Sequence, residues 1–488
     1  MMRHGKVKIQ EPLSGYLTVY AALTLTVMIS LCLVLIEGVR RNTIAFEAEC
    51  VMDIGMDSVL AEYHRELLKR YGLFMIDTSY GTDYPSFYNT QQHLSEYLSR
   101  NLSYEDCHHL SFLYHDLLGM KLEDVQMLRV SLATDNGGRV FQLRAAEHMK
   151  SRLGLEAVEK LLEWTETVEG YGLLEQNIEG QLEQVSTELG QYDGMERQIG
   201  EEEWVKISIS DPTQAALRLR REGILKWVVE DAALLSTATI DPKQYISWRA
   251  ERGEVNHGSS REQEELGLLD NVFLLEYFLA YAGRYGAPLE DSLLQYQVEY
   301  LLCGNACDRD NLHQMASWLC GIREAANVVY LMGDGTKRGE VEALAEILAG
   351  VIAMPELAPL FETALILTWA YLESLYDVRT LLAGGRVELL KTDKNWHYSL
   401  ENIWNPRTED TGGAGDGLSY EDYLRILMYV QPAETLTMRF MDLVEMDIRR
   451  TPGNEFFRMD GCIDGLEAEA SIRSGYGYQF FIRREKKY

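Results

Sequence analysis

The architecture of this chain follows from one segment near its N-terminus, GYLTVYAALTLTVMISLCLVLIEGVRR, residues 15–41. The 21 residues from Tyr16 to Ile36 carry no charge. As an α-helix rising about 1.5 Å per residue, they would cross the roughly 30 Å hydrocarbon core of a membrane. The run is longer than the apolar core of a cleavable signal peptide, and no small-residue cleavage site follows it. We therefore predict a transmembrane helix over residues 16–37, with a buried core helix as the alternative.

Charges flank this segment on both sides. Residues 1–15 form a basic tail that contains Arg3, Lys6 and Lys8, and Arg40 and Arg41 follow the apolar run. The positive-inside balance is therefore not decisive by itself. A single N-terminal span followed by a long acidic region fits best with a cytoplasmic tail. We predict a single-pass protein of the cell membrane, anchored in the lipid bilayer, with the bulk of the chain extracytoplasmic.

The composition describes a folded, acidic protein. The 488 residues are long enough for two or three domains, and 46% of them are hydrophobic. The formal net charge is −30, so the surface repels nucleic-acid phosphates at long range, and we predict no nucleic-acid partner. Seven scattered cysteines are too few for a disulfide scaffold.

A small-residue face runs along the predicted span. Thr18, Ala22, Thr26 and Ser30 recur every four residues. Small side chains let a second transmembrane helix approach closely, and hydroxyl groups can hydrogen-bond across the contact. This face predicts helix packing within the membrane. The alternative is that each hydroxyl bonds the backbone of its own helix, as Ser and Thr commonly do.

The helical pattern continues beyond the span into a predicted stalk helix over residues 38–72, which carries an apolar stripe at helical spacing. The stripe consists of Met52, Met56, Val59, Tyr63 and Leu67. The helix is predicted to end near Tyr71 and Gly72. Either the following domain or a partner subunit would cover the stripe.

The remaining chain predicts a mixed, mainly helical α+β protein. Residues 73–250 read as an α+β lobe that contains an acidic helical linker at 169–203, and 260–488 read as a mainly helical lobe. SLLQYQVEYLL, residues 292–302, has strand character. The last segment predicts a β-hairpin around Ser474 and Gly475.

Motifs for cofactors and metals are weak, and we predict no catalytic, cofactor-binding or metal site. Cys303, Cys307, His313 and Cys320 lack the two close ligand pairs usual for zinc, so zinc, a disulfide and unpaired cysteines all remain open. GDGTK, residues 333–337, fails the order required of a phosphate-binding loop. The histidines at 108, 109 and 115 show no metal-binding helix spacing.

One polar group interrupts an otherwise apolar helix. Glu373 and Asp377 share a face one turn apart, and Arg379 follows them. Two carboxylates at this spacing suit general acid–base catalysis if burial separates their pKa values. The alternative is a structural polar cluster in which the acids pair with arginine inside a helical core.

Three segments carry a family resemblance: residues 15–77, including EYHRELLKRYGLF, then LTWAYLESLYDVRTLLAGGRVELLKT, and LSYEDYLRILMYV. They resemble an uncharacterised membrane-anchored family of Gram-positive anaerobes that is associated with Tad-type pilus and secretion loci. The anchor and stalk are similar in layout to TadE/TadG-type pseudopilins. Pilins of that class are often cut after a glycine, which makes Gly15–Tyr16 a possible processing site, although Tyr20 stands where the class has glutamate.

The resemblance implies a non-enzymatic, pseudopilin-like component of a Tad-type, type IV pilus-like assembly. Its partners would be other pilus or secretion subunits, contacted through the transmembrane and stalk helix. The alternatives are a membrane-anchored surface hydrolase that uses Glu373 and Asp377, and a ligand-binding or sensor protein. Open access to the two acids would favour the hydrolase, and their burial against Arg379 would favour the scaffold.

Overall fold

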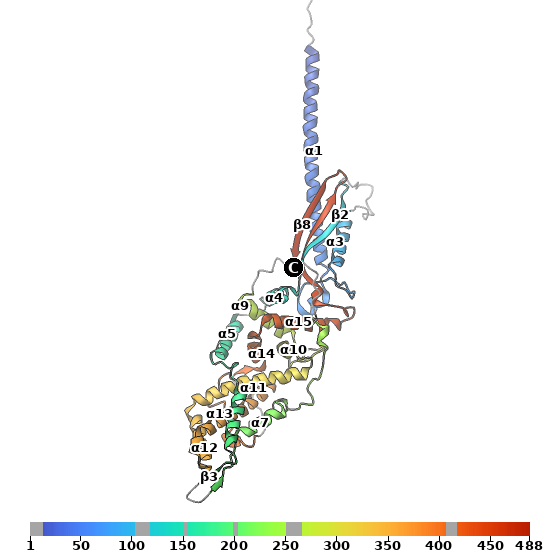
Figure 1. Ribbon diagram of the computed structural model, residues 1–488. Helices are drawn as coiled ribbons and strands as arrows, with labels where there is room; N and C mark the ends of the chain where they lie inside the picture. The colour runs from blue at the N-terminus through green and yellow to red at the C-terminus, as the bar shows by residue number, and fades with distance from the viewer. Residues whose placement is uncertain are drawn as a thin grey trace, which may run out of the picture.

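The computed structural model describes residues 13–102, 118–150, 152, 155–198, 204–249, 266–406 and 417–488. The chain is an α+β mixture with 61% helix and 11% strand, as predicted. Figure 1 shows a long rod, the N-terminal helix α1, that projects from an elongated body. The loop with the histidines at 108, 109 and 115, and most of the basic tail, lie outside the described residues.

Helix α1 spans Leu13–Leu60 and has two halves with different surroundings. In the first half the apolar side chains are uncovered, and the mean hydropathy reaches 2.5, which is long and apolar enough for a membrane span. None of this apolar window is buried inside the structure. In the second half one side is buried, including Ile44, Ala48, Met52 and Met56.

That buried side packs on a small antiparallel sheet. Strand β7 (Cys462–Arg473) pairs with β2 (Lys121–Leu132) and with β8 (Gln479–Lys487), and its first residues pair with β1 (Ile76–Asp77). Helix α3 (Phe87–Leu102) packs on both α1 and β2. These elements share one hydrophobic core and form a unit on the second half of α1, here called the proximal unit. Figure 1 shows the last strand, β8, beside the first helix.

A larger core holds the helical body. Its longest members are α11 (Asp308–Gly333) and α13 (Ala358–Leu382), which pack against each other. The other helices of the body are α2 (Arg65–Tyr71), α4 (Asp135–Lys150), α5 (Leu155–Gly170), α6 (Ile178–Tyr192), α7 (Thr213–Glu222), α8 (Leu225–Val228), α9 (Leu268–Tyr281), α10 (Gln297–Cys303), α12 (Gly335–Val351), α14 (Tyr420–Tyr429) and α15 (Ala433–Arg449). Short two-stranded ladders join β3 (Glu196–Gln198) to β4 (Trp204–Lys206), and β5 (Arg386–Val387) to β6 (Leu418–Ser419).

The predicted stalk helix over 38–72 is interrupted. Helix α1 ends at Leu60, and α2 begins at Arg65 after a break capped by His64, whose Nδ1 accepts the Leu67 amide at 3.1 Å. Just beyond the end of α1, the carboxylate of Glu62 accepts hydrogen bonds from the hydroxyls of Tyr80 and Tyr97. These contacts from distant residues fix the break. The sequence has no proline or glycine at this position that would predict it.

Other segments also depart from the sequence pattern. The cores divide the chain into a proximal unit built from both ends of the chain and a helical body between them, rather than at residues 250–260. Residues 297–303 form helix α10 instead of a strand. The segment 169–203 contains α6, whose Leu182 and Leu189 are fully buried, so it is part of the body and not a solvated linker. The C-terminal hairpin forms as predicted.

Candidate functional sites

The small-residue face of the span is uncovered, and its hydroxyls bond their own helix. Thr18 Oγ1 donates to the carbonyl of Gly15 at 2.9 Å, and Thr26 and Ser30 donate to the carbonyls four residues earlier. The structure therefore contains the alternative hydrogen bonds considered above. Ala22 and these three residues remain available for packing by shape, and a role in assembly stays a prediction. No atom lies within 4 Å of a Cβ built at Gly15, which leaves this position open.

The second half of α1 is held to β8 by charge. Arg484 lies 3.1 Å from Glu49 and 3.3 Å from Asp53, and Lys486 lies 2.7 Å from Asp57. Above these ion pairs, the tip of the β7–β8 hairpin contacts the basic residues that follow the span. The Arg40 guanidinium lies 4.2 Å from the ring centre of Tyr476. The C-terminal hairpin therefore neutralises the acidic side of α1 and reaches to the end of the apolar segment.

The predicted polar cluster is a buried ion-pair network. Asp377 accepts a hydrogen bond from Nε of Arg323 on α11 at 3.0 Å, and Lys391 Nζ lies 2.6 Å from its other oxygen. Lys391 also bonds Glu373, which accepts the backbone amides of His397 and Tyr398. Two acids thus face two bases with almost no exposure to solvent.

This arrangement ties elements together and leaves no free acid. Burial by itself would raise the pKa of Glu373, but the hydrogen bond from His397 and the charge of Lys391 outweigh it, so the pKa lies below its ordinary value. A carboxylate that stays ionised and is closed off from solvent cannot exchange protons with a dissolved substrate. The network joins α11, α13 and the segment after β5.

Arg379 is not part of this network, contrary to the predicted cluster. It points to a different cavity of about 320 Å³, which Tyr285, Tyr296 and Leu382 also line. Its Nε atom is buried without a hydrogen-bond partner among the described residues. Arg379 lies within two helical turns of Glu373 and Asp377, which is why the sequence suggested one cluster. In the structure its side chain leaves α13 on a different side from those of the two acids.

The cysteines considered for a metal or disulfide are free thiols. Cys303, Cys307 and Cys320 form no disulfide, and no cluster of three potential metal ligands is found in the described part of the chain. Cys320 lies 3.0 Å from the hydroxyl of Ser374, and burial raises the pKa of its thiol to about 12. A thiol with that pKa is unreactive at neutral pH.

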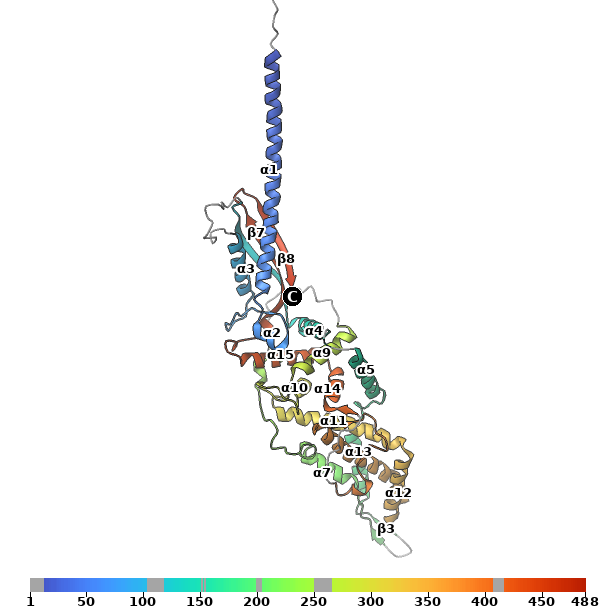
Figure 2. The same cartoon turned by 180° about the vertical axis from the view of Figure 1, so that it is seen from behind.

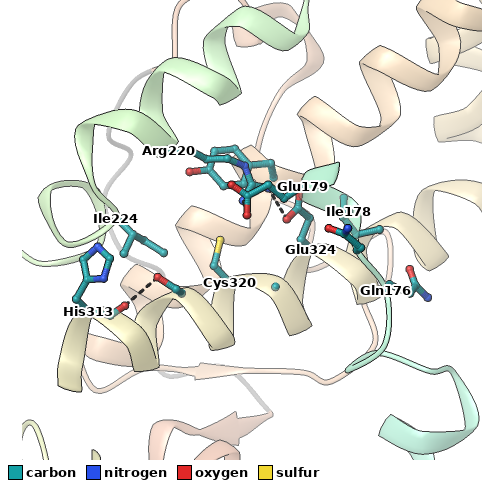
Figure 3. A pocket seen from close by; sticks show the side chains of 12 residues that line it. Gln176, Ile178, Glu179, Arg220, Ile224, His313, Cys320 and Glu324 are labelled. Atoms are coloured by element: carbon teal, nitrogen blue, oxygen red, sulfur yellow. Dashed lines mark hydrogen bonds and ion pairs between the residues drawn. The ribbon is translucent and has the colours of Figure 1, made fainter. Parts of the chain in front are cut away.

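His313 and Cys320 both line an open pocket of about 350 Å³ between α6, α7, α11 and α13 (Figure 3). Arg220 is its central residue. One Arg220 nitrogen donates to both oxygens of Glu324 at 2.7 Å, and the guanidinium lies 4.1 Å from the ring centre of Tyr371. Figure 3 shows the pair facing the pocket with Glu179 beside it.

The positive and negative side chains that line this pocket largely neutralise one another. Burial raises the pKa of Glu324 to about 7, while the charge of Arg220 acts in the opposite direction. Arg220 bonds both oxygens of Glu324, so the acid is held in an ion pair at the pocket wall. The polar lining suits a small polar ligand better than an apolar one.

Sequence reasoning missed Arg220, Arg323, Glu324 and Lys391. One signal was available on α11, because Arg323 and Glu324 interrupt an apolar stretch as Glu373 and Asp377 do on α13. Two apolar helices that each carry buried charge suggest mutual pairing. The partner could not be assigned from spacing, since Arg323 and Asp377 are 54 positions apart.

The comparison with protein families concerns much of the helical body and strand β7 of the sheet. The profile of a family of unknown function, DUF5702, matches residues 202–474. The chain belongs to this family. The DUF5702 region begins after α6 and ends after β7, so it contains the buried network and the Arg220–Glu324 pair but neither α1 nor β8. No curated protein and no solved structure matches the chain.

Proposed function

We propose that this protein is a non-enzymatic, single-pass membrane protein that serves as a pseudopilin-like subunit of a Tad-type pilus or secretion assembly. The observation that carries the proposal is the double role of α1, which is an apolar helix of membrane-spanning length and also the support of an antiparallel sheet. An apolar helix that continues into a stalk is the part of this layout that resembles TadE/TadG-type proteins.

The charges around the end of the span support an extracytoplasmic body. The net charge of −30 would be repelled by an anionic inner leaflet, whereas the short N-terminal tail is basic. Tyr476, which is half exposed, lies at the hairpin tip against Arg40. Tyrosine is common at membrane interfaces, so this hairpin tip would rest at the outer surface of the bilayer.

The two other function classes have less support. A hydrolase that uses Glu373 and Asp377 would need solvent access that both side chains lack. A sensor with a large apolar cleft is not favoured by the pocket around Arg220, which is polar and already carries paired charges. The DUF5702 match adds no activity to either alternative.

The proposal predicts proteolytic processing of the chain at Gly15. Mass spectrometry of the protein extracted from membranes should find a mature N-terminus at Tyr16. In a Gly15→Leu variant the uncut N-terminus should persist, because a bulky side chain replaces hydrogen at the cleavage position. An uncut terminus in the native protein, together with failure to co-purify with pilus or secretion subunits, would remove the pseudopilin assignment.

A further inference from the structure

The side of α1 that faces away from the sheet remains uncovered below the membrane span. Ile44, Ala48 and Met52 are buried against the sheet, but Phe46 keeps 67% of its surface exposed and Ile54 keeps 50%. In Figure 2, α1 lies in front of the strands, and no described element crosses it. Exposed apolar surface costs roughly 25 cal/mol per Å² relative to its burial, so these two side chains favour a cover.

One line of residues along this side, here called the outer stripe, is exposed except at Cys50, which is half-buried. It consists of Cys32, Ile36, Val39, Thr43, Phe46, Cys50 and Ile54. Steps of three and four residues place them on one side of a helix with about 3.6 residues per turn. Within the line, Val39 and Phe46 are seven residues apart, as are Thr43 and Cys50. This is the spacing through which two parallel helices pack side by side.

The outer stripe itself carries no charged side chain. It contains no ionisable residue other than its two thiols. Two of the acidic residues at its edge, Asp53 and Asp57, lie against Arg484 and Lys486 of the same chain. Glu47, at the other edge, forms no ion pair among the described residues, so the stripe is uncharged and β8 neutralises the acids on one side of it.

The span determines which partner fits this surface. In a membrane, every copy of the chain has the same orientation and the same depth. Two copies are therefore already aligned along the helix axis, with Phe46 opposite Phe46 and Cys50 opposite Cys50. The outer stripe also continues upward into the span through Ile36 and Cys32, so the same contact extends into the bilayer.

We propose that α1 pairs in parallel with α1 of a second copy through the outer stripe, with the two Cys50 thiols near each other. This inference rests on the proposed assembly role and deepens it by naming the first partner. It concerns pairing alone and requires no cleavage at Gly15, so the two proposals can fail separately.

Crosslinking of the full chain in its membranes tests the pairing. In a Cys32→Ser background, a short bismaleimide should give a product of twice the monomer mass, and Cys50→Ser should abolish it. A Cys50→Ser/Asn42→Cys variant moves the thiol about two turns along the helix to the exposed edge of the outer stripe, and it should crosslink more weakly than Cys50. Phe46→Glu should lower the yield at Cys50 about tenfold or more, which corresponds to ~1.4 kcal/mol. Asn42→Glu, which adds the same charge at the edge of the outer stripe, should lower the yield far less.

Three outcomes would overturn the inference. One is a Cys50 that reacts with a monofunctional maleimide but gives no dimer. Another is equal crosslinking from the cysteine at position 42, and the third is a Cys50 product that contains a different protein. Monofunctional labelling and protease resistance of the body confirm that each variant is folded. A Cys50 dimer with an uncut N-terminus would sustain the pairing while the processing prediction fails.

Discussion

At the residue scale, Lys391 holds together the buried charges of the body. It contacts both Glu373 and Asp377, and its own side chain is 2% exposed. We expect Lys391→Met to lower the free energy of unfolding by about 3–5 kcal/mol, because Glu373 would lose its lysine partner and Asp377 would keep Arg323 alone. Thermal and denaturant unfolding of the detergent-solubilised chain measures this loss.

Two controls separate the charge effect from the loss of a side chain. Lys394→Met removes an exposed lysine three positions away and should change stability by less than about 0.5 kcal/mol. The Glu373→Gln/Lys391→Met double variant should be more stable than Lys391→Met, since it removes the uncompensated acid. If Lys391→Met were as stable as Lys394→Met, the network would not contribute to the stability of the fold.

Glu299 makes the stability of the body depend on pH. Its Oε1 accepts the Tyr285 amide at 2.9 Å and the Tyr420 hydroxyl at 2.6 Å, while Oε2 has no hydrogen-bond partner in the described structure. Burial raises the pKa of Glu299 to about 7, against an ordinary value of 4.5. Between these values the folded state retains a proton that the unfolded state has lost, so the free energy of unfolding falls as pH rises.

We expect Glu299→Gln to reduce this pH dependence, because the amide keeps both accepted hydrogen bonds and never ionises. Relative to the native chain, the variant should gain roughly 1–3 kcal/mol between pH 5 and pH 8. Thermal melts at the two pH values measure the difference, and Glu290→Gln in an exposed loop serves as the matched control. A parallel shift of both proteins with pH would contradict the assignment.

At the element scale, β8 closes the proximal unit. It pairs with β7 over Gly465–Arg473, contributes Ile482 to the core, and supplies the bases that face α1. We expect a chain that ends at Tyr478 to lose amide protection in α1 and α3 by about 100-fold or more, while α11 and α13 stay protected. Hydrogen exchange followed by mass spectrometry resolves the two regions.

Phe481→Ser is the corresponding control, since this β8 side chain is 65% exposed and its loss removes no core contact. The variant should retain the protection of the native chain. Persistent protection of α3 in the shortened chain would mean that β2 and β7 suffice for the proximal unit.

Elements with a local signal were predictable, and those that depend on distant contacts were not. The C-terminal hairpin alternates around Ser474, and α13 is a long apolar run, so both follow from the sequence. Helix α10 is almost fully buried, and in such a segment the apolar pattern does not distinguish helix from strand. The acids at 373 and 377 were identified, but their basic partners come from other elements.

At the scale of the whole molecule, the division into units was the least predictable property. The proximal unit joins residues 44–60 to residues 462–488, and a linear scan for composition changes cannot detect such a pairing. Arg144 links the two units, because it lies 2.6 Å from Asp464 and also bonds the backbone carbonyl of Tyr488. The helical body is thus inserted between the strands of the sheet that packs on α1.

This insertion sets the order of events during synthesis. The anchor emerges first, yet the sheet that covers its lower half is completed only when the last strand arrives, more than 400 residues later. Because contacts between distant parts of a chain form late, the body gains its structure while the proximal unit is still open. A chain that stops early would leave the buried side of α1, with Ile44, Ala48 and Met52, uncovered. Completion of the hairpin is therefore the step that closes the core of the proximal unit.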